Sequence, residues 1–231
     1  MGLLLDRRRM IASSNDFNLT SQSVDNHLAQ YDDNEGVSYH EFGHAVAAII
    51  LNVRFDHVSV IHSEENVTGG RVAFGEHPCD WRLVNASSID HSLRYCIFLM
   101  AGMAAQLRWH GKKADLKACG SNDRDALDTA CILIAAKVSF EVGKNTKQIG
   151  EDSQEVKIIK DWAWREACLM MANPRAWAAV CSLARHLYTS EQETAAESDV
   201  AEIVAAAKVC YRPTRGIAEI TRAMAITVTS P

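Results

Sequence analysis

The chain has 231 residues, 48% of them hydrophobic, and a formal net charge of −5 at pH 7. A chain of this length and composition can bury a sizeable core without disulfide bonds. The acidic balance argues against a nucleic-acid-binding protein, which usually carries a basic surface, so we expect no nucleic-acid partner.

The seven cysteines are odd in number and include no CxxC pair. This pattern argues against a cysteine-ligated zinc cluster and favours free thiols in a reducing compartment. The longest purely apolar run, 45–51, is far too short to span a bilayer. We therefore expect a cytoplasmic protein with no membrane span.

The first ordered element is expected after a polar, flexible N-terminal arm, residues 1–36. Ser38 and Glu41 then form a capping-box pattern, with Ser38 as the N-cap, and apolar residues follow at helical spacing. We expect this helix to end near Asn52.

The segments 55–62 and 68–74 alternate in hydrophobicity and predict a small antiparallel hairpin. The rest of the chain carries helical patterns, interrupted at Gly111 and Pro174. These patterns predict helices over about 88–109, 120–142, 151–173, 175–188 and 195–209. The first of these helices is expected to turn inward Leu93, Ile97, Phe98, Ala101, Ala104 and Ala105, and the second carries Ala126, Ala130, Leu133 and Ile134. The predicted fold class is α+β and mainly α-helical, with a small antiparallel sheet and a helical C-terminal tail.

Residues 40–44 read His-Glu-Phe-Gly-His, an HExxH motif. Positions i and i+4 share one helical face, so the imidazoles of His40 and His44 can reach one metal ion. Glu41 lies about 100° around the helix, where its carboxylate can accept a proton from water without binding the metal. The motif predicts a zincin-like helix with two histidine ligands and Glu41 as general base.

A catalytic zinc site needs a third protein ligand and one open position. Two common patterns are absent, because residue 50 is Ile rather than histidine and the helix 88–109 contains no glutamate, with Gln106 at the natural position. The remaining carboxylate candidates lie in a loop or at the start of the next helix: Glu64, Glu65, Glu76 and Asp123.

Three segments, in the same order, resemble FtsH-type zinc metalloproteases. Residues 37–45 (VSYHEFGHA) resemble the family's zinc-binding helix, which typically reads YHEAGHA, and residues 101–106 (AGMAAQ) resemble its GGRAAE helix. Residues 120–123 (GSND), with Ala126 and Thr129-Ala130 beyond them, resemble its SND…AT segment.

The glycine-containing segment 68–74 is also similar to the strand on which that family would hold an extended peptide. The resemblance is good over about residues 37–135 and weaker to about residue 209. It implies a zinc peptidase core over 37–145, a helical extension of the same domain over 146–210 and a C-terminal tail over 211–231.

In that family, the aspartate of the SND segment is the third zinc ligand, so the resemblance implies this role for Asp123 and one Zn²⁺ per chain. His110 and Cys119 are nearby alternatives. The implied activity is that of a zinc metalloendopeptidase in which Glu41 activates water. Gln106 stands where the family has glutamate, and is a candidate to orient a ligand histidine through one hydrogen bond.

Other differences from the family's sequence pattern bear on the expected activity. Phe42 replaces a small residue between the ligands, and its ring either narrows the site or fills the core. Met103 and Gln106 replace the usual arginine and glutamate. These replacements support an alternative hypothesis, a non-catalytic zinc-binding interaction module, whereas retention of Glu41 speaks against it.

The sequence contains neither the ATP-binding motif GxxxxGK[ST] nor the membrane anchor of FtsH proteins. We therefore expect a stand-alone, ATP-independent peptidase that acts on peptides or flexible protein segments, unless a separate ATPase or adaptor supplies substrates. A dedicated regulatory protease with a single protein target is a further alternative, and the oligomeric state stays open.

Overall fold

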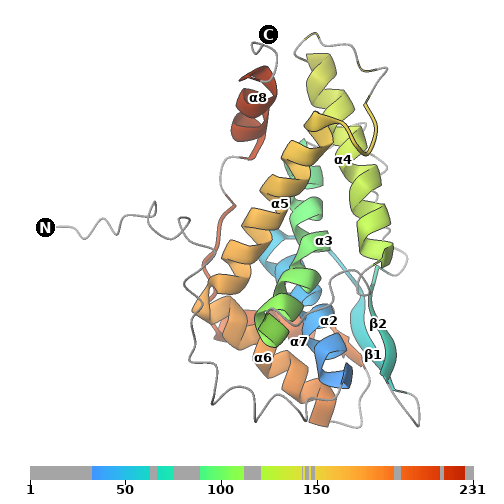
Figure 1. The fold of residues 1–231 in the computed structure, drawn as a ribbon. Helices are drawn as coiled ribbons and strands as arrows, with labels where there is room; N and C mark the ends of the chain where they lie inside the picture. Colours follow the sequence, from blue (N-terminus) through green and yellow to red (C-terminus); the bar gives the residue numbers. More distant parts are fainter. Residues whose placement is uncertain are drawn as a thin grey trace, which may run out of the picture. The chain divides into compact units, whose positions relative to one another are not determined.

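The structure, a computed structural model, describes residues 33–62, 67–74, 89–111, 121–141, 143, 146, 149–189, 194–213 and 216–226. In these residues the protein is mainly helical with one small antiparallel sheet (Figure 1), which confirms the predicted class. The helices are α2 (Asp33–Leu51), α3 (Ile89–His110), α4 (Ser121–Glu141), α5 (Gln154–Ala172), α6 (Pro174–Thr189), α7 (Glu197–Ala206) and α8 (Gly216–Ile226). The strands are β1 (His57–His62), β2 (Val67–Ala73) and β3 (Thr194–Ala196).

Helix α2 lies at the centre and contacts α3, α6, α7 and the strands β1 and β2. Because neighbours surround it, Ala45 and Val46 are fully buried. Phe42 is also fully buried in the core, which decides between the two roles considered for its ring: it packs in the interior.

The predicted start of this helix is wrong. Helix α2 begins at Asp33, and Ser38 is a buried residue within it, so Ser38 is not an N-cap and the capping box does not exist. Residues 33–36, assigned to the flexible arm, are helical, and the rest of that arm lies outside the described residues. The predicted end is confirmed, because Asn52 follows the last helical residue with φ at 57°, in the left-handed region.

Helices α2 and α3 pack unusually close together at Gly43. A Cβ atom at this position would lie 2.5 Å from Cβ of Ala105 and 2.7 Å from the carbonyl oxygen of Ala101, so only glycine permits this approach. Helix α3 ends at His110 and Gly111 follows with φ at 62°, as the sequence predicted. The short distance between the two backbones brings the α3 side chains within reach of the HExxH face of α2.

The sheet has the strand order β2-β1-β3, and all its pairs are antiparallel. The hairpin β1–β2 confirms the prediction. The strand β3 was not predicted. It has only three residues, and its strand conformation depends on pairing with β1, where Ala195 lies opposite Val58. Val58 and Val60 are fully buried on the face toward α2. In the described part of the chain, β2 is therefore an edge strand.

Helix α4 packs against α3 and α5 through Leu127, Ala130 and Ile134. Leu133, another apolar residue of this helix, is 39% exposed. An ion pair between Lys160 Nζ and Asp128 Oδ1, 2.6 Å long, also joins α5 to α4. These contacts fix the helix whose first turn carries Asp123.

The described C-terminal part of the chain is mainly helical. Pro174 does not merely end α5: it begins α6, and Asn173 Oδ1 accepts hydrogen bonds from the backbone N–H groups of the next turn, at Arg175 and Ala176. The segment 211–231, predicted as a tail, contains helix α8, which packs on α5 and α3. The described residues, all within 33–226, belong to one compact unit.

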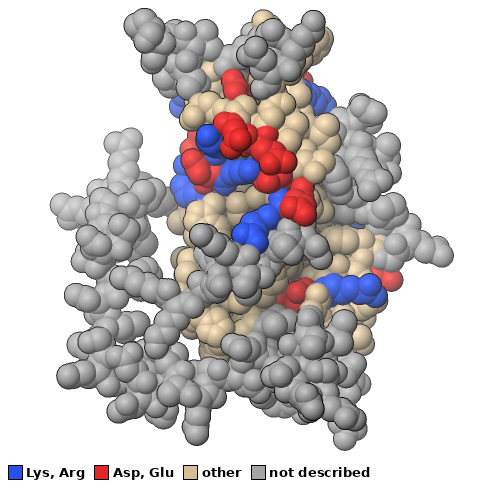
Figure 2. Space-filling view, turned by 45° about the vertical axis from the view of Figure 1, so that its right-hand side comes forward, with Lys and Arg blue, Asp and Glu red and all other residues tan. Residues whose placement is uncertain are grey.

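On the face drawn in Figure 2, acidic and basic side chains are interleaved. An ion pair between Arg165 and Glu219 joins α5 to α8. None of the described helices combines the length and the apolar character that crossing a membrane requires.

Candidate metal centre

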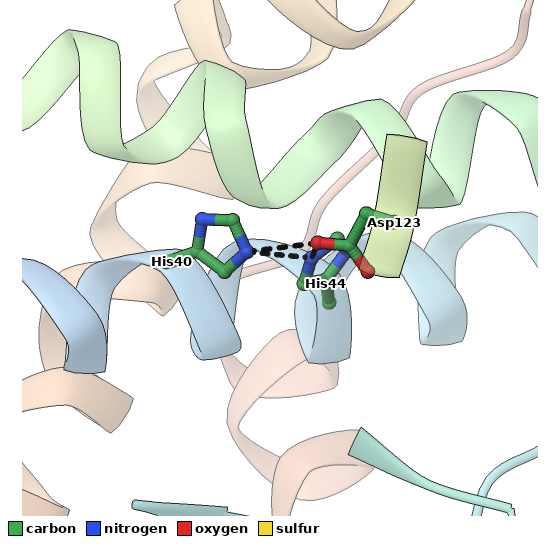
Figure 3. A group of neighbouring side chains, drawn as sticks. All are labelled: His40, His44 and Asp123. Atoms are coloured by element: carbon green, nitrogen blue, oxygen red, sulfur yellow. Dashed lines mark hydrogen bonds and ion pairs between the residues drawn. The ribbon is translucent and has the colours of Figure 1, made fainter. Parts of the chain in front are cut away.

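Two histidines of α2 meet a carboxylate from the first turn of α4 (Figure 3). His40 and His44 are one helical turn apart and both are buried. Their Nε2 atoms lie 3.1 Å apart, as the i, i+4 spacing predicts for two imidazoles that face one point.

The other ring nitrogens of the two histidines are held by α3. His44 Nδ1 donates a hydrogen bond to the backbone oxygen of Phe98, at 2.8 Å, and His40 Nδ1 donates to Oε1 of Gln106, at 3.2 Å. With the proton held on Nδ1, each neutral imidazole presents the lone pair of Nε2. Gln106 therefore lies where an orienting residue is expected. The role of the Phe98 carbonyl could not be predicted from the sequence, because every residue has a backbone carbonyl.

Asp123 completes the group. Its Oδ2 atom lies 3.1 Å from Nε2 of His40 and 3.1 Å from Nε2 of His44, and its side chain is 25% exposed. In the described part of the chain, these three residues form the one group of at least three side chains able to hold a metal ion.

The geometry of the three atoms fits zinc. Bonds of about 2.0–2.1 Å in a tetrahedral centre place neighbouring ligand atoms roughly 3.3 Å apart, and the two nitrogens and the oxygen are each 3.1 Å from the others. Among the described residues no fourth ligand joins the two imidazoles and the carboxylate, and three protein ligands with one open position are the pattern of catalytic zinc sites. The same ligand types also suit other divalent transition ions.

His44 and Asp123 shift each other's pKa in opposite directions. Burial alone would lower the pKa of His44, but the charge of Asp123 and its hydrogen bond raise it to about 9. Burial would raise the pKa of Asp123, but the charge of His44 and hydrogen bonds from both imidazoles hold it well below its usual range. A divalent cation bound between these groups would compete with protons for the same nitrogen and oxygen atoms, so metal binding would release protons.

Glu41 lies beside the three residues, and β2 covers its side chain. It is only 7% exposed, and burial raises its pKa, while His44 and His40 partly oppose that shift. A Cβ atom on residue 70 would overlap Cγ of Glu41, so Gly70 lets the strand pass directly over this carboxylate. The glycine pair 69–70 in an otherwise β-forming segment is the signal that could have predicted this contact.

Gly102 of α3 has a similar role at His44. A Cβ atom there would overlap the imidazole ring, so a side chain at this position would displace the Nε2 atom from the site.

Of the other proposed ligands, His110 is not part of this group, because it lies at the end of α3 and packs against Gly36 of α2. Cys119 and the loop carboxylates Glu64, Glu65 and Glu76 lie outside the described residues.

Comparison with known proteins adds no assignment. The chain matches no family model, and no match is found among the curated proteins. The features that point to a function are therefore the geometry of His40, Glu41, His44 and Asp123 and the resemblance of the segments around them.

Proposed function

We propose that the chain is a zinc-dependent metalloendopeptidase of the FtsH type, built around a zincin-like helix. The observation that carries the proposal is the position of Asp123 Oδ2, 3.1 Å from Nε2 of both histidines of the HExxH helix. This carboxylate comes from a different helix, and it is the one that the resemblance indicates.

The chain's own residues have distinct roles in this reaction. His40, His44 and Asp123 would hold the metal, and Gln106 and the Phe98 carbonyl would orient the two imidazoles. A zinc ion bound there would polarise the scissile carbonyl and acidify a water molecule. Glu41 would take the proton from the attacking water and pass it to the leaving amine, so that hydrolysis yields a carboxylate and an amine.

The surroundings of Glu41 support an extended peptide as substrate. Strand β2 passes over Glu41 at Gly70 and is an edge strand in the described part of the sheet. An edge strand can pair with an added peptide through main-chain hydrogen bonds. A peptide bound along β2 would lie beside the proposed base, which favours peptides and flexible protein segments over folded domains.

The alternative is a zinc-binding interaction module without catalysis. A purely structural zinc has no use for a second carboxylate that does not bind the metal, and a buried carboxylate carries a free-energy cost. The retention of Glu41 at 7% exposure beside the ligands therefore favours catalysis.

Replacement of Glu41 tests the proposal. Glu41→Gln keeps the shape of the side chain, so the variant should retain zinc and lose cleavage of a fluorescence-quenched peptide library. Glu202→Gln, at an exposed position of α7, serves as the matched control and should cleave normally. Full activity of Glu41→Gln contradicts the mechanism, and a zinc-loaded native chain that cleaves no peptide favours the interaction module.

A further inference from the structure

A single exposed cation lies on the strand that passes over the proposed base. Arg71 of β2 is exposed and directly follows Gly70, whose backbone covers Glu41. Within the described part of the chain, the Arg71 side chain takes part in no hydrogen bond or ion pair. Its guanidinium is thus available to a carboxylate from outside the chain.

The pairing of the strands shows on which face this charge lies. Gly70 pairs with Val60 and Val72 pairs with Val58, so these positions face α2 and the site. Arg71 pairs with Ser59 and therefore lies on the opposite face, because successive side chains of a strand alternate. The neighbouring side chain across the strand pair is an uncharged serine, which leaves the charge of Arg71 unneutralised.

We propose that Arg71 selects substrates with an acidic side chain within about two residues of the scissile bond. This inference rests on the proposed function, in which an extended peptide pairs with the free edge of β2. A peptide in that position would place every second side chain on the face that carries Arg71, at cross-strand distance from the guanidinium. Since Gly70 marks the position of Glu41 along the strand, the residue paired with Arg71 is close to the bond that is cleaved.

A charged residue on an edge strand can also have a protective role, because it discourages pairing between copies of the chain. The two roles predict different behaviour. A protective arginine affects aggregation and is indifferent to the charge of a bound peptide, whereas a selective arginine discriminates between peptides in the monodisperse protein.

Binding to the inactive chain tests the proposal without any cleavage step. Zinc-loaded Glu41→Gln protein is titrated into three fluorescein-labelled ten-residue peptides that carry Asp, Asn or Lys at alternate positions of one valine- and alanine-containing sequence. At low ionic strength, the Asp peptide should bind about two- to fivefold more tightly than the Asn peptide, and the Lys peptide more weakly.

Variants of the arginines show whether Arg71 itself causes the preference for the Asp peptide. Arg71→Gln, made in the Glu41→Gln protein, should abolish the preference, and Arg71→Glu should reverse it. Arg54→Gln removes another exposed arginine, one already paired with Glu197, and should leave the preference unchanged. Circular dichroism and size-exclusion chromatography confirm that each variant is folded and not aggregated.

The outcomes distinguish the two proposals. Equal binding of the three peptides by the parent, or an unchanged preference in Arg71→Gln, overturns the role of Arg71 and leaves the peptidase proposal intact. An Arg71→Gln protein that aggregates while its soluble fraction keeps the preference assigns the arginine a protective role and likewise overturns the inference. Absence of binding by every peptide overturns the inference together with the peptide site on β2.

Discussion

Oδ2 of Asp123 lies 3.1 Å from Nε2 of His40, although 83 residues separate them in the sequence. One belongs to α2 and the other to the first turn of α4, so the three proposed ligands meet only when α4 is packed against α3 and α5. The unfolded chain does not hold these groups together, and metal binding should therefore be coupled to folding.

Zinc should accordingly raise the thermal stability of the native chain. At a free zinc concentration of about 100 times Kd, linkage adds roughly 2.7 kcal/mol to the free energy of unfolding, which corresponds to about 5–10 °C in Tm for a domain of this size. Differential scanning calorimetry with zinc and with a chelator measures the shift. Equal Tm values under the two conditions would contradict the coupling.

Gln106 should matter for metal affinity because its Oε1 is the acceptor for the Nδ1–H of His40. Gln106→Ala removes that acceptor and is expected to weaken zinc binding by about 10- to 100-fold. Gln106→Glu keeps an acceptor at the same reach and should bind zinc at least as well as the native chain. Competition against a zinc-chelating indicator gives the three affinities, and an unchanged affinity in Gln106→Ala would exclude the orienting role.

Gly70→Ala should separate catalysis from metal binding. A methyl group at this position overlaps Cγ of Glu41 and forces the carboxylate or the strand to move, while His40, His44 and Asp123 are untouched. We expect normal zinc content with a loss of peptide cleavage of at least about tenfold, since misplacement of a catalytic group by about 1 Å can cost 100-fold. Gly150→Ala is the matched control, because a Cβ atom there meets no atom within 4 Å. Equal activity of both variants would show that Glu41 tolerates displacement.

Tyr211 should make the protein less stable at high pH. Burial, together with its hydrogen bond to Glu166 and the charge of that carboxylate, raises the pKa of Tyr211. As pH rises through about 10, the ordinary tyrosine value, the unfolded chain releases a proton that the folded chain keeps, so the free energy of unfolding falls. Below that pH the contribution of Tyr211 is fully present.

The comparison with Tyr211→Phe isolates this effect. The variant should be less stable at pH 8 by about 1–3 kcal/mol, because the buried carboxylate of Glu166 loses a donor. From pH 8 to pH 10.5, however, its stability should fall less than that of the native chain. Urea unfolding at the two pH values measures both free energies, and an identical decrease in the two proteins would contradict the linkage.

The local part of the site could be predicted from the sequence, because it depends on helix geometry alone. Two histidines at i and i+4 on one helix necessarily share a face, and the structure places their Nε2 atoms 3.1 Å apart. Asp123 could not be selected from the residues alone, since its proximity depends on how α4 packs. Only the resemblance distinguished it from Glu64, Glu65 and Glu76.

The sequence-based predictions that failed, the helix start and the third strand, also depend on contacts between distant segments. Ser38 has the chemistry of an N-cap, but the tertiary environment of α2 extends the helix back to Asp33. The strand β3 has three residues, and its conformation is set by pairing with β1 rather than by its own sequence. Local patterns identified most helices and the hairpin, whereas contacts between distant segments decided the helix start, the third strand and the Phe98 carbonyl at His44.

The most direct test of the metal centre is the zinc content of protein purified without chelator, measured by mass spectrometry for the native chain, Asp123→Ala and Asp125→Ala. Asp125 is an exposed carboxylate in the same turn of α4 and controls for the loss of one negative charge. The predicted result is about one zinc per chain in the native protein and in Asp125→Ala, and little or none in Asp123→Ala. Full retention of zinc in Asp123→Ala, or its absence from the native chain, would contradict the proposed centre of His40, His44 and Asp123.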